Sequence, residues 1–228
     1  MGYFWANTMT IIDSIPAPLS ASDVFDRLRF DPAQAGLDGL DGLVVLGQRL
    51  MHPQGVYDVA FVGSKGAGTV DVAGVTFVSP LLRKNLEGAN KVFPYILTVG
   101  PELEQAASAQ GDLLRQYYLE EMANIALEKA ATWLAAGLAE RFGLPPLSNM
   151  SPGSLEDWPI TEQAKLFSIF GDTERLIGVR LTDSMLMVPR KSISGILFPS
   201  EEGFVACQLC DREHCQGRKA PFSGTKTI

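Results

Sequence analysis

Three cysteines, Cys207, Cys210 and Cys215, lie within nine residues near the end of the sequence. A disulfide framework normally uses an even number of cysteines spread along the chain, so this cluster indicates metal, cluster or thiol chemistry. The spacing favours a [4Fe–4S] cluster held by thiolates. Zinc is the alternative, although His214, directly beside Cys215, is an awkward fourth ligand for a tetrahedral ion. Free or disulfide-forming thiols are the third interpretation.

Composition excludes several other kinds of chemistry. The only histidines are His52 and His214, which leaves almost nothing for a Ser-His-Asp triad or a His-rich metal site. The formal net charge of −7 argues against nucleic acid and against an anionic membrane surface as partners. The first basic residue is Arg27, and no 18-residue window lacks charge, so we expect a soluble, cytoplasmic protein.

The chain is long enough for one sizeable core, with 228 residues of which 46% are hydrophobic. Apolar periodicity and turn residues predict helices and strands in mixed order, without regular strand-helix alternation. Helices are predicted at 20–30, 40–50, 101–143 with a break near Gly111, and 161–170. Strands are predicted at 56–62, 69–77, 91–99, 181–188 and 192–198, with the last two adjacent and 148–159 a loop. This order indicates an α+β fold with a mixed or antiparallel twisted sheet and flanking helices.

Two segments carry a family resemblance. Residues 181–198 read LTDSMLMVPRKSISGILF, which resembles the pattern L-T-E-S-x-x-M-x-P-x-x-S-V-S-G of the reactivation domain of cobalamin-dependent methionine synthase. Upstream, SPGS at 151–154, the Trp158-Pro159 pair and KLF at 165–167 are similar to that family's A-P-G-Y-P-x-x-P-x-H-x-x-K segment. The two motifs are at matching distances, and the helix predicted from Gly111 to Gly143 is similar to the one that precedes them in the family.

The resemblance implies a C-shaped α+β domain that binds S-adenosylmethionine and packs against a corrinoid-carrying domain. In the family, inactive cob(II)alamin is reduced by one electron and methylated from S-adenosylmethionine. The organisation expected here is an N-terminal portion over 1–100 packed on the same core, an activation-domain-like core over 101–200, and a cysteine-containing segment over 201–228. The chain is too short to contain the other methionine synthase modules, so we expect a free-standing partner of a methyltransferase that carries the cobalamin.

The resemblance also nominates binding residues. In the family's motif R-x-x-x-G-Y for S-adenosylmethionine, Pro152 and Gly153 are kept, whereas Asn149 stands at the arginine and Ser154 at the tyrosine. Asparagine lacks the charged planar fork that binds a carboxylate through two hydrogen bonds. We therefore expect weak binding of S-adenosylmethionine, if it binds at all.

Three further residues of the second motif are candidates. Asp183, like Glu156, could face the sulfonium or amino group of the ligand, or be an ordinary solvated carboxylate. Ser192 and Ser194 are two residues apart, so a strand would present both hydroxyls on one face, toward a pocket or a corrinoid, or simply as a polar strand face.

Two functions follow. The first is an accessory protein for reductive remethylation of a cobalamin-dependent methyltransferase, with methionine synthase as the expected partner and a low-potential electron donor alongside. In this role the chain would contribute to the methyltransferase activity of cobalamin-dependent methionine synthase. The second is a non-catalytic corrinoid-protein binding module, or an iron–sulfur electron-transfer module, that no longer binds S-adenosylmethionine.

For either function we expect residues 184–194 and 152–158 to dock onto the partner. Trp158, Met185 and Met187 are the candidate anchors of this surface, and we expect Arg190 and Lys191 to steer the encounter.

Overall fold

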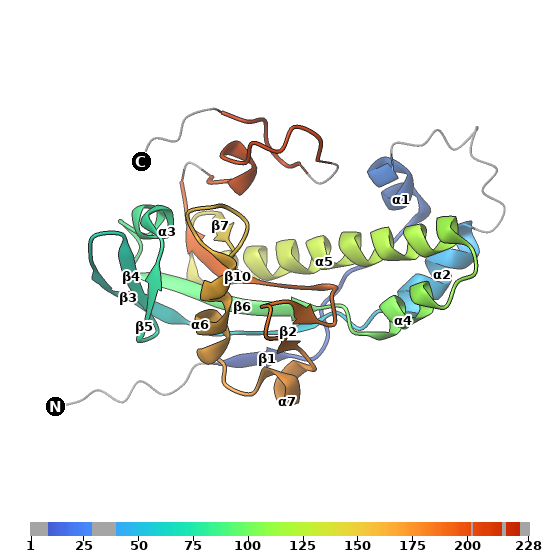
Figure 1. Ribbon diagram of the computed structural model, residues 1–228, viewed down its shortest axis with the longest axis horizontal. Coiled ribbons are helices and arrows are strands. Elements are labelled where there is room, and N and C mark those ends of the chain that lie inside the picture. Colours follow the sequence, from blue (N-terminus) through green and yellow to red (C-terminus); the bar gives the residue numbers. More distant parts are fainter. Residues whose placement is uncertain (1–8, 29–39, 202, 216–217, 224–228) are drawn as a thin grey trace.

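The fold is built on one antiparallel sheet of eight strands, as a computed structural model of residues 9–28, 40–201, 203–215 and 218–223 shows (Figure 1). Helices flank the sheet, so the predicted α+β class is confirmed. The strands of the large sheet are β1 (Thr10–Ile12), β2 (Gln54–Tyr57), β3 (Ala60–Lys65), β4 (Thr69–Val72), β5 (Val75–Val78), β6 (Lys91–Thr98), β7 (Leu147–Met150) and β10 (Ser192–Pro199). A separate two-stranded hairpin is formed by β8 (Arg180–Leu181) and β9 (Met187–Val188).

Strand β6 is the centre of the sheet. One of its edges pairs with β2 and then β3, and its other edge pairs with β10, which in turn pairs with β7. The sequence pattern predicts one strand over 56–62, but the structure divides it into β2 and β3. The interruption faces Pro94 of β6, which has no N–H to donate to a neighbouring strand, although its carbonyl oxygen accepts from the Asp58 N–H at 3.0 Å.

Helices cover both faces of the sheet. On one face the long α5 packs with α1, α2 and α4 over Phe93, Tyr95 and Leu97 of β6. On the other face the segment of α6 and α7 packs on Ile96. Because apolar residues of β6 alternate between two covered faces, the strand is apolar almost throughout. The helices are α1 (Ala21–Leu28), α2 (Leu40–Leu50), α3 (Pro80–Asn85), α4 (Glu102–Ser108), α5 (Leu113–Phe142), α6 (Gln163–Ser168) and α7 (Thr173–Ile177), with short 3₁₀ turns η1 (Ile160–Glu162) and η2 (Ala206–Gln208).

The long helix and its break agree with the sequence pattern. The Asp112 carboxylate caps α5 by accepting from the Leu114 N–H at 2.8 Å, and Gly143 ends it in the left-handed conformation at φ +59°. Two aromatic residues of α5, Trp133 and Tyr117, are 42% and 36% exposed. Both lie on the outer side of a helix whose opposite side already covers the sheet.

Two sequence-based assignments near the second motif are also wrong. The run 181–188 is not a strand beside β10: its middle residues form the turn of the β8–β9 hairpin, where Thr182 Oγ1 accepts from the Leu186 N–H and Met185 adopts φ +63°. Residues 147–150, within or next to the predicted loop, form β7. Their strand conformation depends on pairing with β10, which is distant in sequence.

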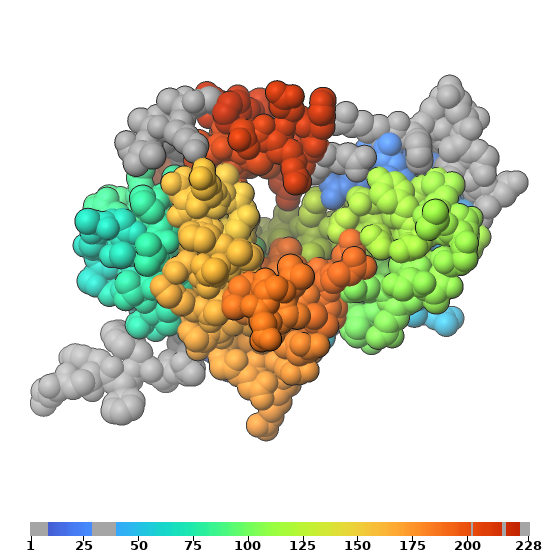
Figure 2. Space-filling view, viewed as in Figure 1, coloured from blue at the N-terminus to red at the C-terminus, as the bar shows by residue number. Residues whose placement is uncertain are grey.

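One face of the molecule is concave. Figure 2 shows a hollow bordered by the C-terminal segment in red, the yellow and orange segments that follow β7, and the green helical region. This shape agrees with the C-shaped domain that the resemblance implies. None of the helices in the described ranges is long and apolar enough to cross a membrane.

Candidate functional site

The two motif segments meet at a cleft on the concave side, which we call the apolar cleft. Its volume is about 450 Å³, within the range usual for small-ligand sites. Its walls come from two segments that are more than twenty positions apart in the chain. It is lined by residues 151–154, Ile160, Gln163, residues 185–187, Arg190, Ile193 and Ser194.

A second cleft, the polar cleft, adjoins the first, because Ser151 and Ile193 line both. Its volume is about 490 Å³. It is lined by Tyr95 and Asn149 of the sheet and, on the helix side, by residues of α5: Asn124, Leu127, Glu128, Ala131, Thr132 and Ala135. A ligand longer than either cleft can therefore extend from one into the other past Ser151.

Asn149 is held within a side-chain network at this junction. The Tyr95 hydroxyl donates to Asn149 Oδ1 at 3.1 Å, and Asn149 Nδ2 donates to Ser151 Oγ at 3.2 Å. Burial raises the pKa of Tyr95 well above its usual range, although a hydrogen bond with Ser151 opposes the shift. The phenol therefore stays protonated and keeps donating to Asn149, which fixes the amide at the position where the family motif has arginine.

The loop after β7 owes its shape to Trp158. This side chain is fully buried and packs edge-on against Phe77, with ring centroids 5.7 Å apart. The backbone carbonyl oxygen of Trp158 accepts from the Gly153 N–H at 2.7 Å, and this hydrogen bond closes the loop with Gly153 at φ +79°. Gly153 and Ser154 are thereby exposed at the apolar cleft. Since Trp158 is core, it cannot be the docking anchor that we considered from the sequence.

The structure separates the candidate residues of the second motif. Asp183 is exposed in the β8–β9 turn and lines neither cleft. Ser192 is buried next to Thr98 and the Pro189 carbonyl, away from the clefts. Ser194 lines the apolar cleft together with Pro152, Gly153 and Ser154. Asn149 lies in the polar cleft.

Some residues that line the clefts were not singled out from the sequence. Tyr95 belongs to an apolar strand, and nothing local marks its hydroxyl as facing a cleft. Gln163 is buried at the start of α6, where its side-chain nitrogen donates to the Met185 carbonyl oxygen at 3.2 Å. This hydrogen bond joins the two motif segments across the apolar cleft. The signal that could have identified Gln163 from the sequence is an uncharged amide in a helix whose apolar residues are buried.

Gly195 is where β7 and β10 approach most closely beside the clefts. A Cβ added there would lie 2.5 Å from the Met150 carbonyl oxygen and 2.6 Å from Asn149 Oδ1. We expect Gly195→Ala to lower the free energy of unfolding by about 1–3 kcal/mol, because β7 must move to make room. Gly137→Ala in α5 is the control: no atom of the described residues lies within 4 Å of an added Cβ, so it should stabilise the fold by about 0.5–1 kcal/mol. Urea denaturation of both variants measures this, and equal stabilities would contradict the close approach.

The cysteine segment is held by an arginine rather than by converging thiols. The Arg218 guanidinium donates to the carbonyl oxygens of Cys207 at 2.9 Å and Cys210 at 3.1 Å, while Cys207 Sγ accepts from the Lys219 N–H at 3.4 Å. All three cysteines are free and half-buried, and Cys215 lines a different pocket from Cys210. Over the described ranges, no group of three His, Cys, Asp or Glu side chains is placed to hold a metal ion. This arrangement does not fit an iron–sulfur cluster or zinc, so we assign no chemical step to either, and the metal site stays a sequence prediction.

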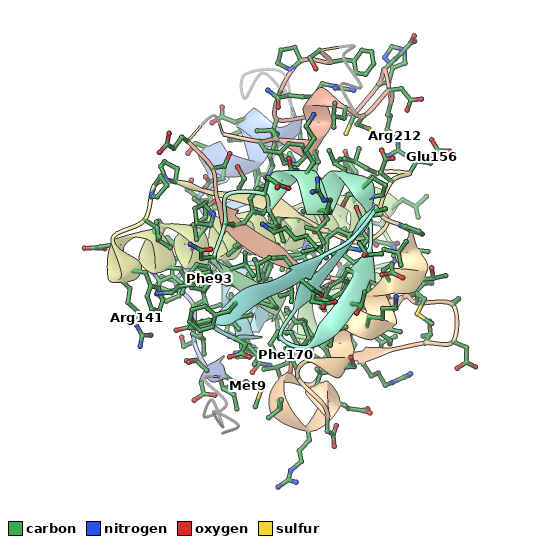
Figure 3. All side chains as sticks on the ribbon, turned by 90° about the vertical axis from the view of Figure 1, so that its left-hand side faces the viewer. Met9, Phe93, Arg141, Glu156, Phe170 and Arg212 are labelled. Carbon is green, nitrogen blue, oxygen red and sulfur yellow. The ribbon has the colours of Figure 1, made fainter. Side chains whose placement is uncertain are left out.

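The segment nevertheless lies close to the site. Leu209, Cys210 and Phe222 line a small pocket together with residues 154–157, so the two loops are neighbours. Figure 3 shows the labelled Glu156 and Arg212 near one another at this edge of the molecule. Lys219 reaches the polar cleft, where its Nζ is 3.9 Å from a Glu128 carboxylate oxygen of α5. The C-terminal segment therefore borders the polar cleft through Lys219 and lies beside the loop that contains Ser154 of the apolar cleft.

Comparisons with known proteins agree with this geometry. The family model described as vitamin B12 dependent methionine synthase, activation domain, matches residues 153–216. Among solved structures, a crystal structure of the MetH reactivation domain bound to AdoHcy is similar with a TM-score of 0.58 and 17% sequence identity. The similarity covers 87% of this chain and 81% of that chain. No curated protein matches the sequence. The resemblance to the activation domain of cobalamin-dependent methionine synthase is thus confirmed, by the family model over residues 153–216 and by the fold over most of the chain.

Proposed function

We propose that this chain acts in the reductive reactivation of a cobalamin-dependent methyltransferase, with methionine synthase as the expected partner. The corrinoid is carried by the partner, and S-adenosylmethionine is bound by this chain. A separate low-potential donor supplies one electron to cob(II)alamin and converts it to cob(I)alamin. The cob(I) centre then takes the methyl group from the sulfonium, which releases S-adenosylhomocysteine and restores methylcobalamin.

The observation that carries this proposal is the meeting of the two motif segments in one ligand-sized cleft. Both segments that resemble the family contribute to the apolar cleft, the first through residues 151–154 and the second through residues 185–187, Arg190, Ile193 and Ser194. The cleft has the composition expected of a small-molecule site: mainly apolar walls with a few polar groups. Ser194 provides a buried hydroxyl that has no partner within the described part of the chain, and Gly153 is exposed at the cleft. The residues present therefore fit an S-adenosyl ligand.

The rim of the apolar cleft supports docking of a second protein. Leu186 and Ile160 line the cleft and are 63% and 42% exposed, which is a high exposure for large apolar side chains. They give the rim the apolar centre that a protein interface needs. Arg190 is less available than the sequence indicates, because its guanidinium pairs with Glu104 of α4 at 2.5 Å. Lys191 Nζ donates to Asn124 of α5 at 2.9 Å, so this turn holds the fold as well as bordering the cleft.

Reactivation can be tested directly. The chain is mixed with the cob(II)alamin form of a methionine synthase that lacks its own activation domain, together with a low-potential reductant and methyl-labelled S-adenosylmethionine. We expect absorbance to change to that of methylcobalamin and the label to enter the cobalamin, at a rate that depends on this chain. The control omits S-adenosylmethionine. Labelling at the same rate with and without the chain would contradict the proposal.

The asparagine in the polar cleft favours a second candidate, a corrinoid-protein binding module without S-adenosylmethionine. The Asn149 side chain already makes hydrogen bonds with Tyr95 and Ser151, and it brings no positive charge to a ligand carboxylate. In this case calorimetry would detect binding to the corrinoid protein but none to S-adenosylmethionine. The same titrations therefore separate the two functions.

A further inference from the structure

We propose that the Ser194 hydroxyl is a ligand-binding group that recognises the adenosyl part of the ligand in the apolar cleft. This inference rests on the proposed function for the identity of the ligand. Ser194 is 3% exposed, and its Oγ has no hydrogen-bond partner among the residues that the structure describes. A buried hydroxyl without a partner costs free energy, so its presence in a cleft points to a partner that arrives from outside the chain.

Ser192 shows what an ordinary buried serine of the same strand does. It lies on the same face of β10, two residues earlier, and is 5% exposed. Its Oγ donates to the Pro189 carbonyl oxygen at 2.7 Å and is 3.0 Å from Thr98 Oγ1. Ser192 does not line the apolar cleft. The two serines therefore share a strand, a face and a degree of burial, and they differ in whether the protein itself satisfies the hydroxyl.

The walls of the cleft indicate which part of a ligand Ser194 meets. The side chains of Met185, Leu186 and Met187 border the cleft on one side, and Ile160 and Ile193 border it elsewhere. Such walls suit an uncharged, planar group, since they offer polarisable apolar contacts and no compensation for charge. Arg190, the one cation of the lining, is paired with Glu104. A nucleoside fits these surroundings, with the serine hydroxyl bonded to one of its polar atoms.

The test uses the variants Ser194→Ala and Ser192→Ala with three probes: S-adenosylmethionine, S-adenosylhomocysteine and adenosine. Loss of one neutral hydrogen bond should weaken binding of all three to Ser194→Ala by about 3–10-fold in calorimetry. Because the Ser194 hydroxyl has no partner to lose among the described residues, Ser194→Ala should also raise the melting temperature by about 2–4 °C. Ser192→Ala should lower the melting temperature and leave binding within twofold. A merely structural serine would give the Ser192 result at both positions.

The outcomes distinguish this inference from the proposed function. If the native chain binds the probes and Ser194→Ala binds them equally well, the inference is overturned and the proposed function stands. If the native chain binds none of the probes, S-adenosylmethionine binding is overturned, and the melting temperatures decide the role of Ser194. A rise for Ser194→Ala then supports a hydroxyl kept for a ligand, whereas no change or a fall overturns it.

Discussion

Replacing Trp158 by alanine is expected to lower the free energy of unfolding by about 3–5 kcal/mol, the cost of removing a large, fully buried aromatic side chain. Trp158 has no exposed surface and packs against Phe77 in the cluster that joins β4, β5 and α3 to β10. Urea denaturation followed by circular dichroism measures the effect.

Trp133→Ala is the matched control for this prediction. The same residue type on α5 is 42% exposed and should change the stability by less than about 1 kcal/mol. Trp158→Ala should also loosen the loop 151–158, because the buried indole fixes the position of the Trp158 backbone carbonyl oxygen, which accepts from the Gly153 N–H at 2.7 Å. Faster amide hydrogen exchange at Gly153 reports that loosening. Similar losses of stability for the two tryptophan variants would show that Trp158 is not the core residue described above.

The double variant Asn149→Arg with Ser154→Tyr is expected to bind S-adenosylmethionine about 10–150-fold more tightly than the native chain. This range corresponds to one charge-assisted hydrogen-bonded contact of about 1.5–3 kcal/mol between an arginine and the ligand carboxylate. The two positions lie in the adjoining polar and apolar clefts, on either side of Ser151, so one extended ligand can reach both. Calorimetry measures the dissociation constants.

Asn149→Lys with Ser154→Tyr is the control that adds charge without the planar fork. It should gain less affinity than the arginine variant, because lysine makes no bidentate contact with a carboxylate. Both variants lose the hydrogen bonds that Asn149 makes with Tyr95 and Ser151, so the comparison between them cancels that cost. An unchanged affinity in both would show that the ligand carboxylate does not lie at position 149.

The cysteine segment is the part of the site for which sequence and structure differ most. The spacing of Cys207, Cys210 and Cys215 predicts a shared metal or cluster, yet the segment is held by hydrogen bonds from Arg218 to backbone carbonyl groups. Nothing in the spacing marks Arg218 as the residue that organises this segment. A guanidinium with five N–H donors can bind several carbonyl oxygens at once, and only the folded path of the chain brings those oxygens together.

The sequence by itself determined the features whose signals are local. The cap at Asp112, the left-handed end at Gly143 and the break near Gly111 define α5, because each depends on a few neighbouring residues. The apolar run of β6 and the two motif segments were likewise identifiable from the sequence. The family model and the similar solved structure agree with the fold that those motifs implied.

Only the tertiary structure decided which strands pair and which polar groups are satisfied. β10 pairs with β6 and β7 rather than with the run before it, and β7 is a strand because β10 lies beside it. Ser192 and Ser194 look alike in the sequence, but Thr98, ninety-four positions before Ser192, is a partner of its hydroxyl, whereas the Ser194 hydroxyl has none among the described residues. The physical reason is that hydrogen bonds and burial are set by neighbours in space, and for these residues those neighbours are distant along the chain.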